Sequence, residues 1–302
     1  MPEQFFSERS RGDWSIDTLD LDAYLTRIGY TGPRTPSEAT LTAIYEAHLA
    51  TVRFENFGIF LDGGVRVDLA SIQEKIVFRG RGGYCYEQAQ LFGAALERLG
   101  FGVERMLARV GPDSDGPARP RTHLTLRASA DGGVWLADIG FGSSPPRPLS
   151  LRRLRSGGPQ DIDGWIYEIA PDEERGEEVW KLREYQAGAW VTLHRWDHTK
   201  VHPVDVVMSN HYTSTYPDSW FTWQPMIVRR DPDAIRSVLG RTYTVNYVGH
   251  VNKERRELSD AEFAAALTGE FAMPLSSEEV ATLVAAPTGH DREPAAGVAP
   301  GT

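Results

Sequence analysis

Cysteine and long apolar runs are the two features that this sequence most clearly lacks. Cys85 is the only cysteine among 302 residues, so no disulfide can form within the chain and the fold does not depend on oxidation. No apolar run approaches the roughly 18 residues that a membrane-spanning helix needs. The first residues, MPEQFFSERSRGDW, also lack the apolar core and the cleavage pattern of a signal peptide. We therefore expect a cytoplasmic protein with no membrane partner.

Positive charge is also scarce. The chain has 32 Lys and Arg against 42 Asp and Glu, and its formal net charge is −10. This balance argues against a nucleic-acid partner and against anionic membranes, but it says nothing about a small substrate. The apolar fraction of 41% is enough for a sizeable core, and the length suggests two or three domains or one large one.

The first hundred residues predict helices. Apolar residues recur at helical spacing in DTLDLDAYLTRIGY, TPSEATLTAIYEAHL and DLASIQEKIVF. In the second of these stretches, Thr35 is the expected N-cap, Pro36 the first helical residue, and Glu38 completes a capping box. A fourth helix is predicted over residues 85–99, and Gly100 ends it.

The remaining two thirds change character. Short runs rich in Val, Ile, Trp and Tyr follow, separated by Gly, Pro and Asp, which is typical of antiparallel strands in a sheet or barrel. Later, DPDAIRSVLG is predicted as a helix and RTYTVNYVG as a strand. Two further helices carry capping boxes, Ser259 with Glu262 and Ser276 with Glu279. The order of elements predicts an α+β chain in four parts: residues 1–102, 103–208 and 209–288, and a flexible tail over 289–302.

The single cysteine lies in RGRGGYCYEQAQLF, behind two glycines and at the expected start of a helix. A thiol is a nucleophile only as thiolate, and the free N–H groups and dipole of a helix N-terminus favour that anion. Gly82 and Gly83 let the backbone turn tightly before Cys85, and Tyr86 and Phe92 belong to an apolar face of the helix. The alternative is that Cys85 is a small buried hydrophobic residue.

A cysteine nucleophile needs a base, and eight histidines are available. His194, His198 and His202 form a cluster, but their spacing would require a helix to hold a metal, and the surrounding residues indicate a strand and a turn. We therefore expect no metal site. Of four others, His48 is expected in the core or at its boundary and His290 in the tail, and His211 and His250 have no evident partner.

His123 is different because its segment, RTHLTLRASADGGVWLADIGFG, predicts a β-hairpin. A four-residue loop at 129–132 would place His123 directly opposite Asp138, and a two-residue loop, Asp131-Gly132, would make them diagonal neighbours on one face. An odd loop without a bulge would place them on opposite faces. Each alone has a structural interpretation, a histidine in a sheet and a turn aspartate. Together they predict a base and its orienting carboxylate, since an acid in an apolar run is costly to bury without a partner.

Five motifs in order then resemble the arylamine N-acetyltransferase family, over roughly residues 18–285. VRFENF resembles the family's Val-Pro-Phe-Glu-Asn, and RGGYCYEQ its active-site Arg-Gly-Gly-x-Cys-x-Glu. THL carries the family histidine, DIGFG the aspartate, and STYPDSWF resembles Ser-Thr-x-Pro-x-Ser-x-Phe. Cys85, His123 and Asp138 match the family triad residue by residue. The implied fold is an N-terminal helical bundle, a central antiparallel β-barrel and a C-terminal α/β lid, with a cysteine-protease-like core.

The resemblance implies a ping-pong acyl transfer with no bound cofactor. Cys85 would take the acetyl group from acetyl-CoA, and an arylamine, hydrazine or hydroxylamine would accept it with His123 as base. The acyl-donor and arylamine cleft would be lined by Thr122, Phe141, Gly142 and Phe221, with core packing the alternative for these residues. Glu55 and Arg81 would form ion pairs around the active-site helix, unless they form only an exposed pair.

Two positions depart from the family pattern. Arg53 stands where the family has proline, and Ala89 where it has asparagine. Related amide synthases use the same triad to close or release macrolactams, with a polyketide thioester on an acyl carrier protein as donor, and they are the main alternative. A thiol hydrolase of the transglutaminase or protease type, and a non-catalytic binding module, are the other two alternatives.

Overall fold

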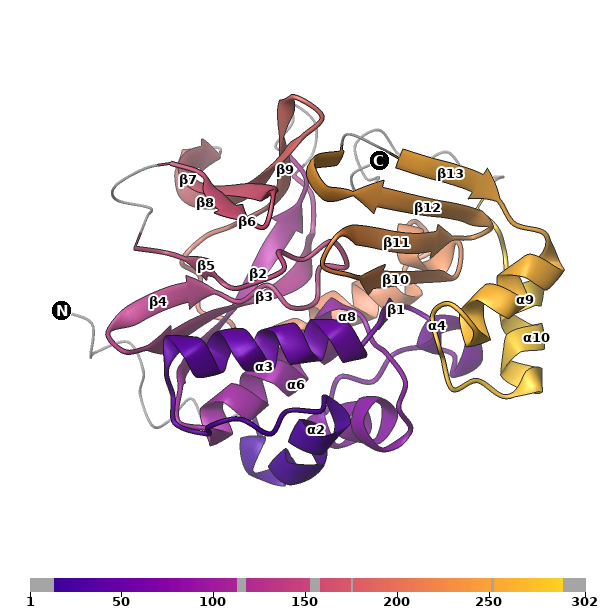
Figure 1. Ribbon diagram of the computed structural model, residues 1–302, viewed down its shortest axis with the longest axis horizontal. Coiled ribbons are helices and arrows are strands. Elements are labelled where there is room, and N and C mark those ends of the chain that lie inside the picture. The colour runs from indigo at the N-terminus through magenta and orange to yellow at the C-terminus, as the bar shows by residue number, and fades with distance from the viewer. Residues whose placement is uncertain (1–13, 113–117, 153–157, 175, 251–252, 290–302) are drawn as a thin grey trace.

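The structure is a computed structural model, and it describes residues 14–112, 118–152, 158–174, 176–250 and 253–289. Figure 1 shows three groups of elements: helices at the bottom, a strongly curved sheet at the upper left, and a second sheet at the upper right with two helices beside it. The helices are α2 (Leu21–Arg27), α3 (Glu38–Thr51), α4 (Gly58–Leu61), α5 (Leu69–Gln73), α6 (Cys85–Arg98), α8 (Pro203–Thr215), α9 (Asp260–Thr268) and α10 (Ser277–Ala285). Short helical turns are η1 (Ile16–Thr18), η2 (Glu74–Phe78), η3 (Trp220–Thr222) and η4 (Val248–His250).

Helix α6 is the centre of the N-terminal part. Residues 85–97 are all buried, so the single apolar face predicted from the sequence is too narrow a description. The polar side chains on the other faces have partners in the interior: Gln88 donates to the carbonyl of Gly83 at 2.6 Å, and Glu97 pairs with Arg105 at 2.8 Å. A helix buried on every side is held rigidly, and Cys85 is its first residue.

The start of α3 differs from the prediction. Its N-cap is Ser37 rather than Thr35, because the Ser37 side chain accepts the backbone N–H of Thr40 at 3.1 Å. Glu38 is therefore the first helical residue, and Pro36 lies before the helix. The predicted capping boxes of the last two helices are confirmed at Ser259 and Ser276.

Eight antiparallel strands form the central sheet, in the order β5-β4-β3-β2-β9-β8-β7-β6. Its two edges approach each other, because the Gln160 side chain bonds both backbone groups of Ser150, at 2.9 and 3.2 Å. The sheet is thus a nearly closed barrel, filled by Trp165, Tyr167 and Leu182 among others. The strands are β2 (Gly102–Val110), β3 (Arg121–Ala130), β4 (Gly133–Leu136), β5 (Leu149–Ser150), β6 (Gln160–Ile162), β7 (Trp165–Glu174), β8 (Glu177–Gln186) and β9 (Ala189–Trp196).

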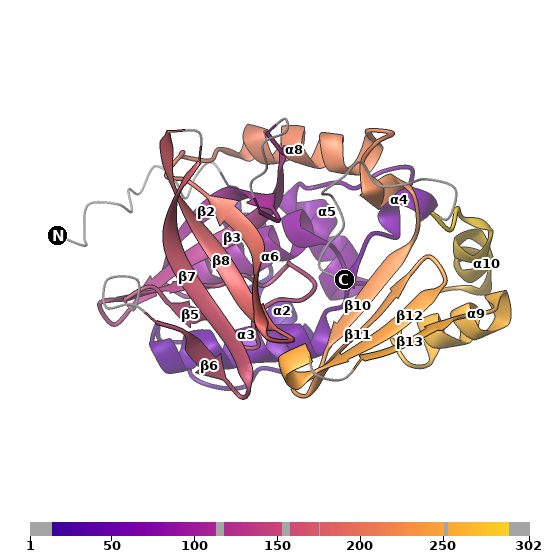
Figure 2. The same ribbon diagram turned by 90° about the horizontal axis from the view of Figure 1, so that it is seen from above.

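The second sheet has the order β1-β10-β11-β12-β13. Its strands are β1 (Phe54–Glu55), β10 (Met226–Arg230), β11 (Ala234–Leu239), β12 (Thr242–Tyr247) and β13 (Lys253–Glu257). Figure 2, seen from above, places this sheet beside the barrel, with α9 and α10 at its outer end. Strand β1 comes from the N-terminal part of the chain and pairs with β10, which ties the segment before Cys85 to this sheet.

The prediction of a helix at DPDAIRSVLG is wrong, since these residues form β11. Ala234 and Val238 pack toward α9 and α10, whereas Ile235 packs into the barrel core. Apolar residues at positions i, i+1 and i+4 imitate a helical pattern when both faces of a strand are covered. The segment is a strand because it pairs with β10 on one side and with β12 on the other.

Helix α8 is absent from the prediction, which took Pro203 as part of a strand and turn. Pro203 is the first residue of the helix, a position that needs no N–H donor, and the Asp205 carboxylate accepts the backbone N–H of His202 at 2.7 Å. Figure 2 shows α8 along the upper edge, linking the barrel to the second sheet.

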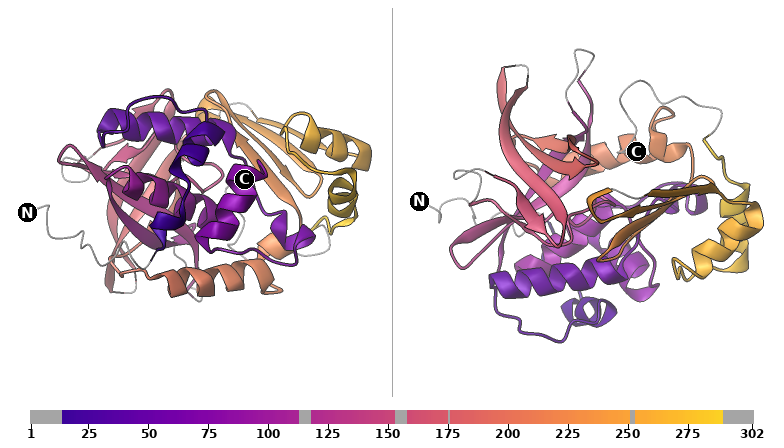
Figure 3. Two further views of the ribbon diagram at one scale, coloured as in Figure 1. Left: turned by 90° about the horizontal axis from the view of Figure 1, so that it is seen from below. Right: turned by 45° about the horizontal axis from the view of Figure 1, so that its top comes forward.

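The confirmed fold class is a helical bundle, a nearly closed barrel and an α/β unit, and the helices lie against both sheets in the views of Figure 3. The exact division at residues 102, 208 and 288 stays a prediction. Within the described ranges, no helix has the length and apolar character of a membrane span. Of the predicted tail, only Gly289 lies among the described residues.

Candidate active site

Cys85 lies at the first position of α6, as predicted, and is 3% exposed. Its thiol lies 3.6 Å from the carbonyl oxygen of Thr122 on β3. The segment after β4 packs directly onto it, because a Cβ on Gly140 would lie only 2.8 Å from the Cys85 Cα. The glycine therefore allows the barrel to approach the helix N-terminus closely enough to share a site.

His123 and Asp138 meet through the predicted hairpin. Ala130 pairs with Gly133 across a two-residue turn, Asp131-Gly132, so the second of the two registers considered is the observed one. Both turn residues have positive φ, 50° and 67°, as a type I′ turn requires. The His123 Nε2 lies 2.6 Å from the Asp138 Oδ1, which leaves Nδ1 as the nitrogen that can exchange a proton with a reacting group.

A second histidine, His194, was missed as part of this site. It lies on β9, and its Nε2 is 2.9 Å from Asp138 Oδ2, so the carboxylate bridges two imidazoles. The histidine rings lie 4.8 Å apart. Only the pairing of β9 with β2 brings His194 here, and no local pattern in the sequence predicts that pairing. The other two members of the predicted cluster do not join it: His198 accepts from the indole of Trp180, and His202 precedes α8.

Burial and charge set the protonation of this group. Burial alone would lower the pKa of His123, but the charge and hydrogen bond of Asp138, with a smaller contribution from Cys85, raise that pKa to about 10. Burial would raise the pKa of Asp138, but the two histidines hold it well below its usual range. Burial lowers the pKa of His194 despite Asp138. The group therefore holds one carboxylate, one imidazolium and one neutral imidazole at neutral pH.

The same three side chains have a spacing that a metal ion could use, since one ligand atom from each lies within 4.8 Å of the others. In the structure the carboxylate oxygens are each already engaged, one by His123 and one by His194. Hydrogen bonding therefore accounts for their arrangement.

Glu55 and Arg81, predicted to support the helix start, are both buried and 3.7 Å apart, so the interpretation as an exposed pair is wrong. Lys75 lies between two acids, 3.2 Å from Glu55 and 2.9 Å from Glu87. Glu87 also accepts the backbone N–H of Tyr84 at 3.0 Å, which caps α6 one residue before Cys85. These contacts form a buried charge network, defined by Glu55, Lys75, Arg81 and Glu87, that fixes the loop before the nucleophile.

The four predicted cleft residues lie around the triad. The Phe141 ring contacts that of His123, with ring centroids 4.9 Å apart. Phe221, on η3, contacts the rings of Tyr84 and Phe54 at centroid distances of 5.7 and 6.4 Å. Gly142 has a φ of 87° and borders a cavity of about 10 Å³, room for one water molecule. Thr122 presents its carbonyl oxygen to Cys85.

Comparison with known proteins decides the family. A sequence model described as N-acetyltransferase matches residues 38–280. The arylamine N-acetyltransferase of Escherichia coli strain K12 is 30% identical over 286 residues, which is 92% of this chain and 98% of that protein. The chain belongs to the arylamine N-acetyltransferase family. As in that family, it is an enzyme, a transferase of acyl groups.

Solved structures of the family agree with this fold. The Nocardia farcinica arylamine N-acetyltransferase superposes with a TM-score of 0.84 at 35% identity, covering 92% of this chain and 98% of that one. The Mycobacterium marinum arylamine N-acetyltransferase in complex with CoA gives a TM-score of 0.79 at 28% identity, covering 89% and 100%. The similarity thus extends over all three parts of the chain.

Proposed function

We propose that this arylamine N-acetyltransferase family member moves the acetyl group of acetyl-CoA to the nitrogen of an arylamine, hydrazine or hydroxylamine, through acetyl-Cys85. One observation carries the proposal: the only cysteine begins a buried helix, beside a histidine held by a buried carboxylate. Relatives over nearly the whole chain are named for the same reaction, and one structure holds CoA. No resident cofactor is required.

The first half-reaction forms the acyl-enzyme. The Cys85 thiolate, beside the His123 imidazolium, attacks the carbonyl carbon of the thioester. The carbonyl oxygen takes the electron pair, and the backbone N–H of Cys85 at the helix start is the proposed donor to it. When the carbonyl reforms, the bond from carbon to the CoA sulfur breaks. The CoA thiolate then takes the proton from the His123 imidazolium.

The second half-reaction returns the enzyme to its starting state. The amine nitrogen attacks the acetyl carbon of acetyl-Cys85 and gives a proton to the neutral His123, while Asp138 stabilises the imidazolium that forms. The bond from carbon to the Cys85 sulfur breaks, and the amide leaves. Phe141, Gly142, Phe221 and Thr122 are proposed to line the space in which thioester and amine bind in turn.

The alternatives differ in donor or acceptor. A carrier-bound polyketide thioester, as amide synthases use, would need the same cysteine, but the comparisons favour acetyl transfer to arylamines. A thiol hydrolase would use water as acceptor. Cytoplasmic location, a small-molecule amine acceptor and the absence of a nucleic-acid partner complete the proposal.

Steady-state kinetics test this function. Acetyl-CoA and an arylamine such as 4-aminosalicylate or a hydrazide such as isoniazid are varied together, and release of free CoA is followed. Parallel double-reciprocal lines, with release that depends on the amine, are the expected result. Rapid CoA release without any amine would favour the hydrolase, and no turnover with acetyl-CoA but turnover of a carrier-bound acyl thioester would favour the amide synthase.

A further inference from the structure

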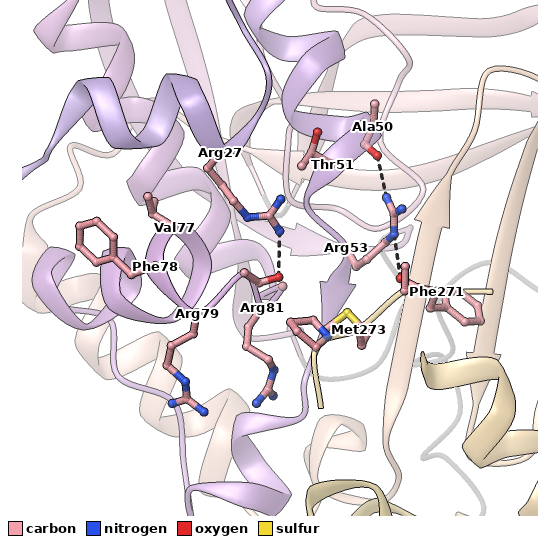
Figure 4. A pocket seen from close by; sticks show the side chains of 14 residues that line it. Arg27, Ala50, Thr51, Arg53, Val77, Phe78, Arg79, Arg81, Phe271 and Met273 are labelled. Carbon is pink, nitrogen blue, oxygen red and sulfur yellow. Dashed lines mark hydrogen bonds between the residues drawn. The ribbon is translucent and has the colours of Figure 1, made fainter. Parts of the chain in front are cut away.

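A second pocket lies behind the loop that precedes Cys85. It has a volume of about 620 Å³, and its lining includes Arg27, Arg53, Arg79 and Arg81 but no acidic side chain. Neither Cys85, His123 nor Asp138 lines it. Figure 4 shows the arginines reaching the pocket from separate segments of the chain. We call it the arginine pocket. Four cations around one space are unusual in a chain whose net charge is −10.

The four arginines divide into two pairs. Arg79 and Arg81 extend to Glu279 on α10, at 3.5 and 3.1 Å, and Arg81 also faces Glu55. Figure 4 shows these two side chains directed the same way, away from Arg27 and Arg53. Among the described residues, Arg27 and Arg53 have no carboxylate within ion-pair distance. Their charges are the ones that an outside anion could neutralise.

Both unpaired guanidinium groups are held in place by backbone carbonyls. Arg27 donates through Nε to Ile76 at 3.0 Å and through Nη2 to Gly80 at 2.8 Å. Arg53 donates through Nη1 to Ala50 at 2.8 Å and through Nε to Phe271 at 3.3 Å. A guanidinium has five N–H donors, so each group keeps donors for a further acceptor. Their orientation is fixed before any ligand arrives, which lowers the entropy cost of binding.

The charges around Arg27 and Arg53 also favour binding of an anion between them. Burial lowers the pKa of Arg27. Burial, then the charge of Arg229, and also that of Arg27, lower the pKa of Arg53, while Asp231 opposes the shift. Arginine keeps its charge at neutral pH regardless, so both sites remain cations that are partly withdrawn from water and repel each other. An anion between them would relieve that repulsion.

Apart from Thr51, the rest of the lining has no polar side chain. Val77, Met273 and Pro274 border the pocket, and Phe78 beside them is 55% exposed. We propose that the arginine pocket binds a small organic anion, with its phosphate or carboxylate between Arg27 and Arg53 and its apolar part against Phe78 and Met273. Guanidinium groups recognise both kinds of anion with paired hydrogen bonds.

The arginine pocket also borders the loop that precedes Cys85. The Arg53 carbonyl accepts the backbone N–H of Gly83 at 3.1 Å, and a Cβ on Gly82 would lie 2.3 Å from that same oxygen. The anion site and the loop before Cys85 therefore share the backbone of residue 53. The proposal concerns binding, however, and does not depend on the reaction at Cys85.

Calorimetric titration with phenyl phosphate, with benzoate and with neutral benzyl alcohol tests the proposal on the full chain. Saturable one-to-one binding of at least one of the two anions, and no binding of the alcohol, is expected. A tighter phenyl phosphate identifies a phosphate ligand, and a tighter benzoate a carboxylate ligand. Arg53→Gln and Arg27→Gln should each raise the Kd on the order of tenfold, the usual effect of losing one charge-assisted contact.

Arg79→Gln is the matched control, because it removes the same charge from the same lining but its guanidinium pairs with Glu279. Its Kd should stay within about twofold of the wild-type value, and thermal unfolding of every variant establishes that it folds. If Arg53 and Arg27 variants bind the anion as tightly as the wild type, or if neither anion binds saturably at millimolar concentration, the proposal is wrong. An Arg53→Lys variant that recovers part of the affinity would separate charge from structural damage.

Discussion

The active site and the arginine pocket both gather charged side chains, but they treat those charges in opposite ways. Around Cys85 each charge has a partner inside the protein: Asp138 bridges two histidines, and Lys75 lies between two acids. In the arginine pocket, Arg27 and Arg53 have only carbonyl oxygens as partners among the described residues. The comparison indicates that charges paired within the fold hold a reactive group in place, whereas unpaired charges at a cavity are available to bind a ligand.

The largest effect should follow from Asp138→Asn. The amide cannot balance the imidazolium and can fix the wrong tautomer of His123, so kcat/KM for acetyl transfer should fall about 10³–10⁴-fold. Stopped-flow release of CoA measures it. Asp131→Asn, the same change in the hairpin turn, is the control and should retain nearly full activity. An Asp138→Asn enzyme within tenfold of the wild type would remove Asp138 from the proposed mechanism.

Removing one member of the buried charge network should have the next largest effect. Lys75→Met leaves Glu55 and Glu87 facing each other in the interior, so the free energy of unfolding in urea should drop by about 3–5 kcal/mol. Arg66→Met is the matched control, since Arg66 pairs with Asp68 on the surface at 3.2 Å, and its cost should be below about 1 kcal/mol. Equal losses in the two variants would show that burial of the network does not matter.

A smaller effect concerns pH. The pKa of His123 is about 10 in the folded protein, above its usual 6.5. Its charge therefore contributes stability that is complete below pH 6.5 and is lost as pH rises through 10. Between pH 7 and pH 10 the wild type should lose roughly 1–3 kcal/mol more unfolding free energy than His123→Gln. Urea titrations at both pH values measure the difference, and parallel losses would contradict the raised pKa.

The smallest expected effect is the change in stability when an arginine of the arginine pocket is replaced. Without added anion, Arg53→Gln removes a repulsion and two hydrogen bonds to backbone carbonyls but no ion pair. These effects oppose each other, so the unfolding free energy should change by less than about 1 kcal/mol in either direction. Chemical unfolding in an anion-poor buffer measures it beside Lys75→Met. A loss as large as that of Lys75→Met would mean that Arg53 is balanced within the fold, and the contrast between the two regions would disappear.

The parts of the site that could be predicted from the sequence are those joined by short stretches of chain. The Asp131-Gly132 turn, one of the loops considered, keeps His123 and Asp138 on one face, and the glycines before Cys85 indicate a tight turn into a helix. Local chain geometry decides both. The family resemblance added the roles of Glu55 and Arg81, and the structure shows them buried together.

What could not be predicted depends on contacts between distant segments. His194 reaches Asp138 only because β9 pairs with β2, and β11 is a strand only because it lies between two others. The lining of the arginine pocket comes from three separate regions, residues 27–53, 77–82 and 271–274, so no single sequence motif predicts it. Hydrophobic periodicity predicts one helix or strand at a time, whereas these features depend on contacts between several of them.

The intact mass of the protein after incubation with acetyl-CoA alone tests the central claim most directly. The wild type should gain one acetyl group, Cys85→Ala should gain none, and adding an arylamine or hydrazide should return the wild type to its original mass. An unmodified wild type, or an acetyl group that also appears on Cys85→Ala, would contradict the assignment of Cys85 as the nucleophile.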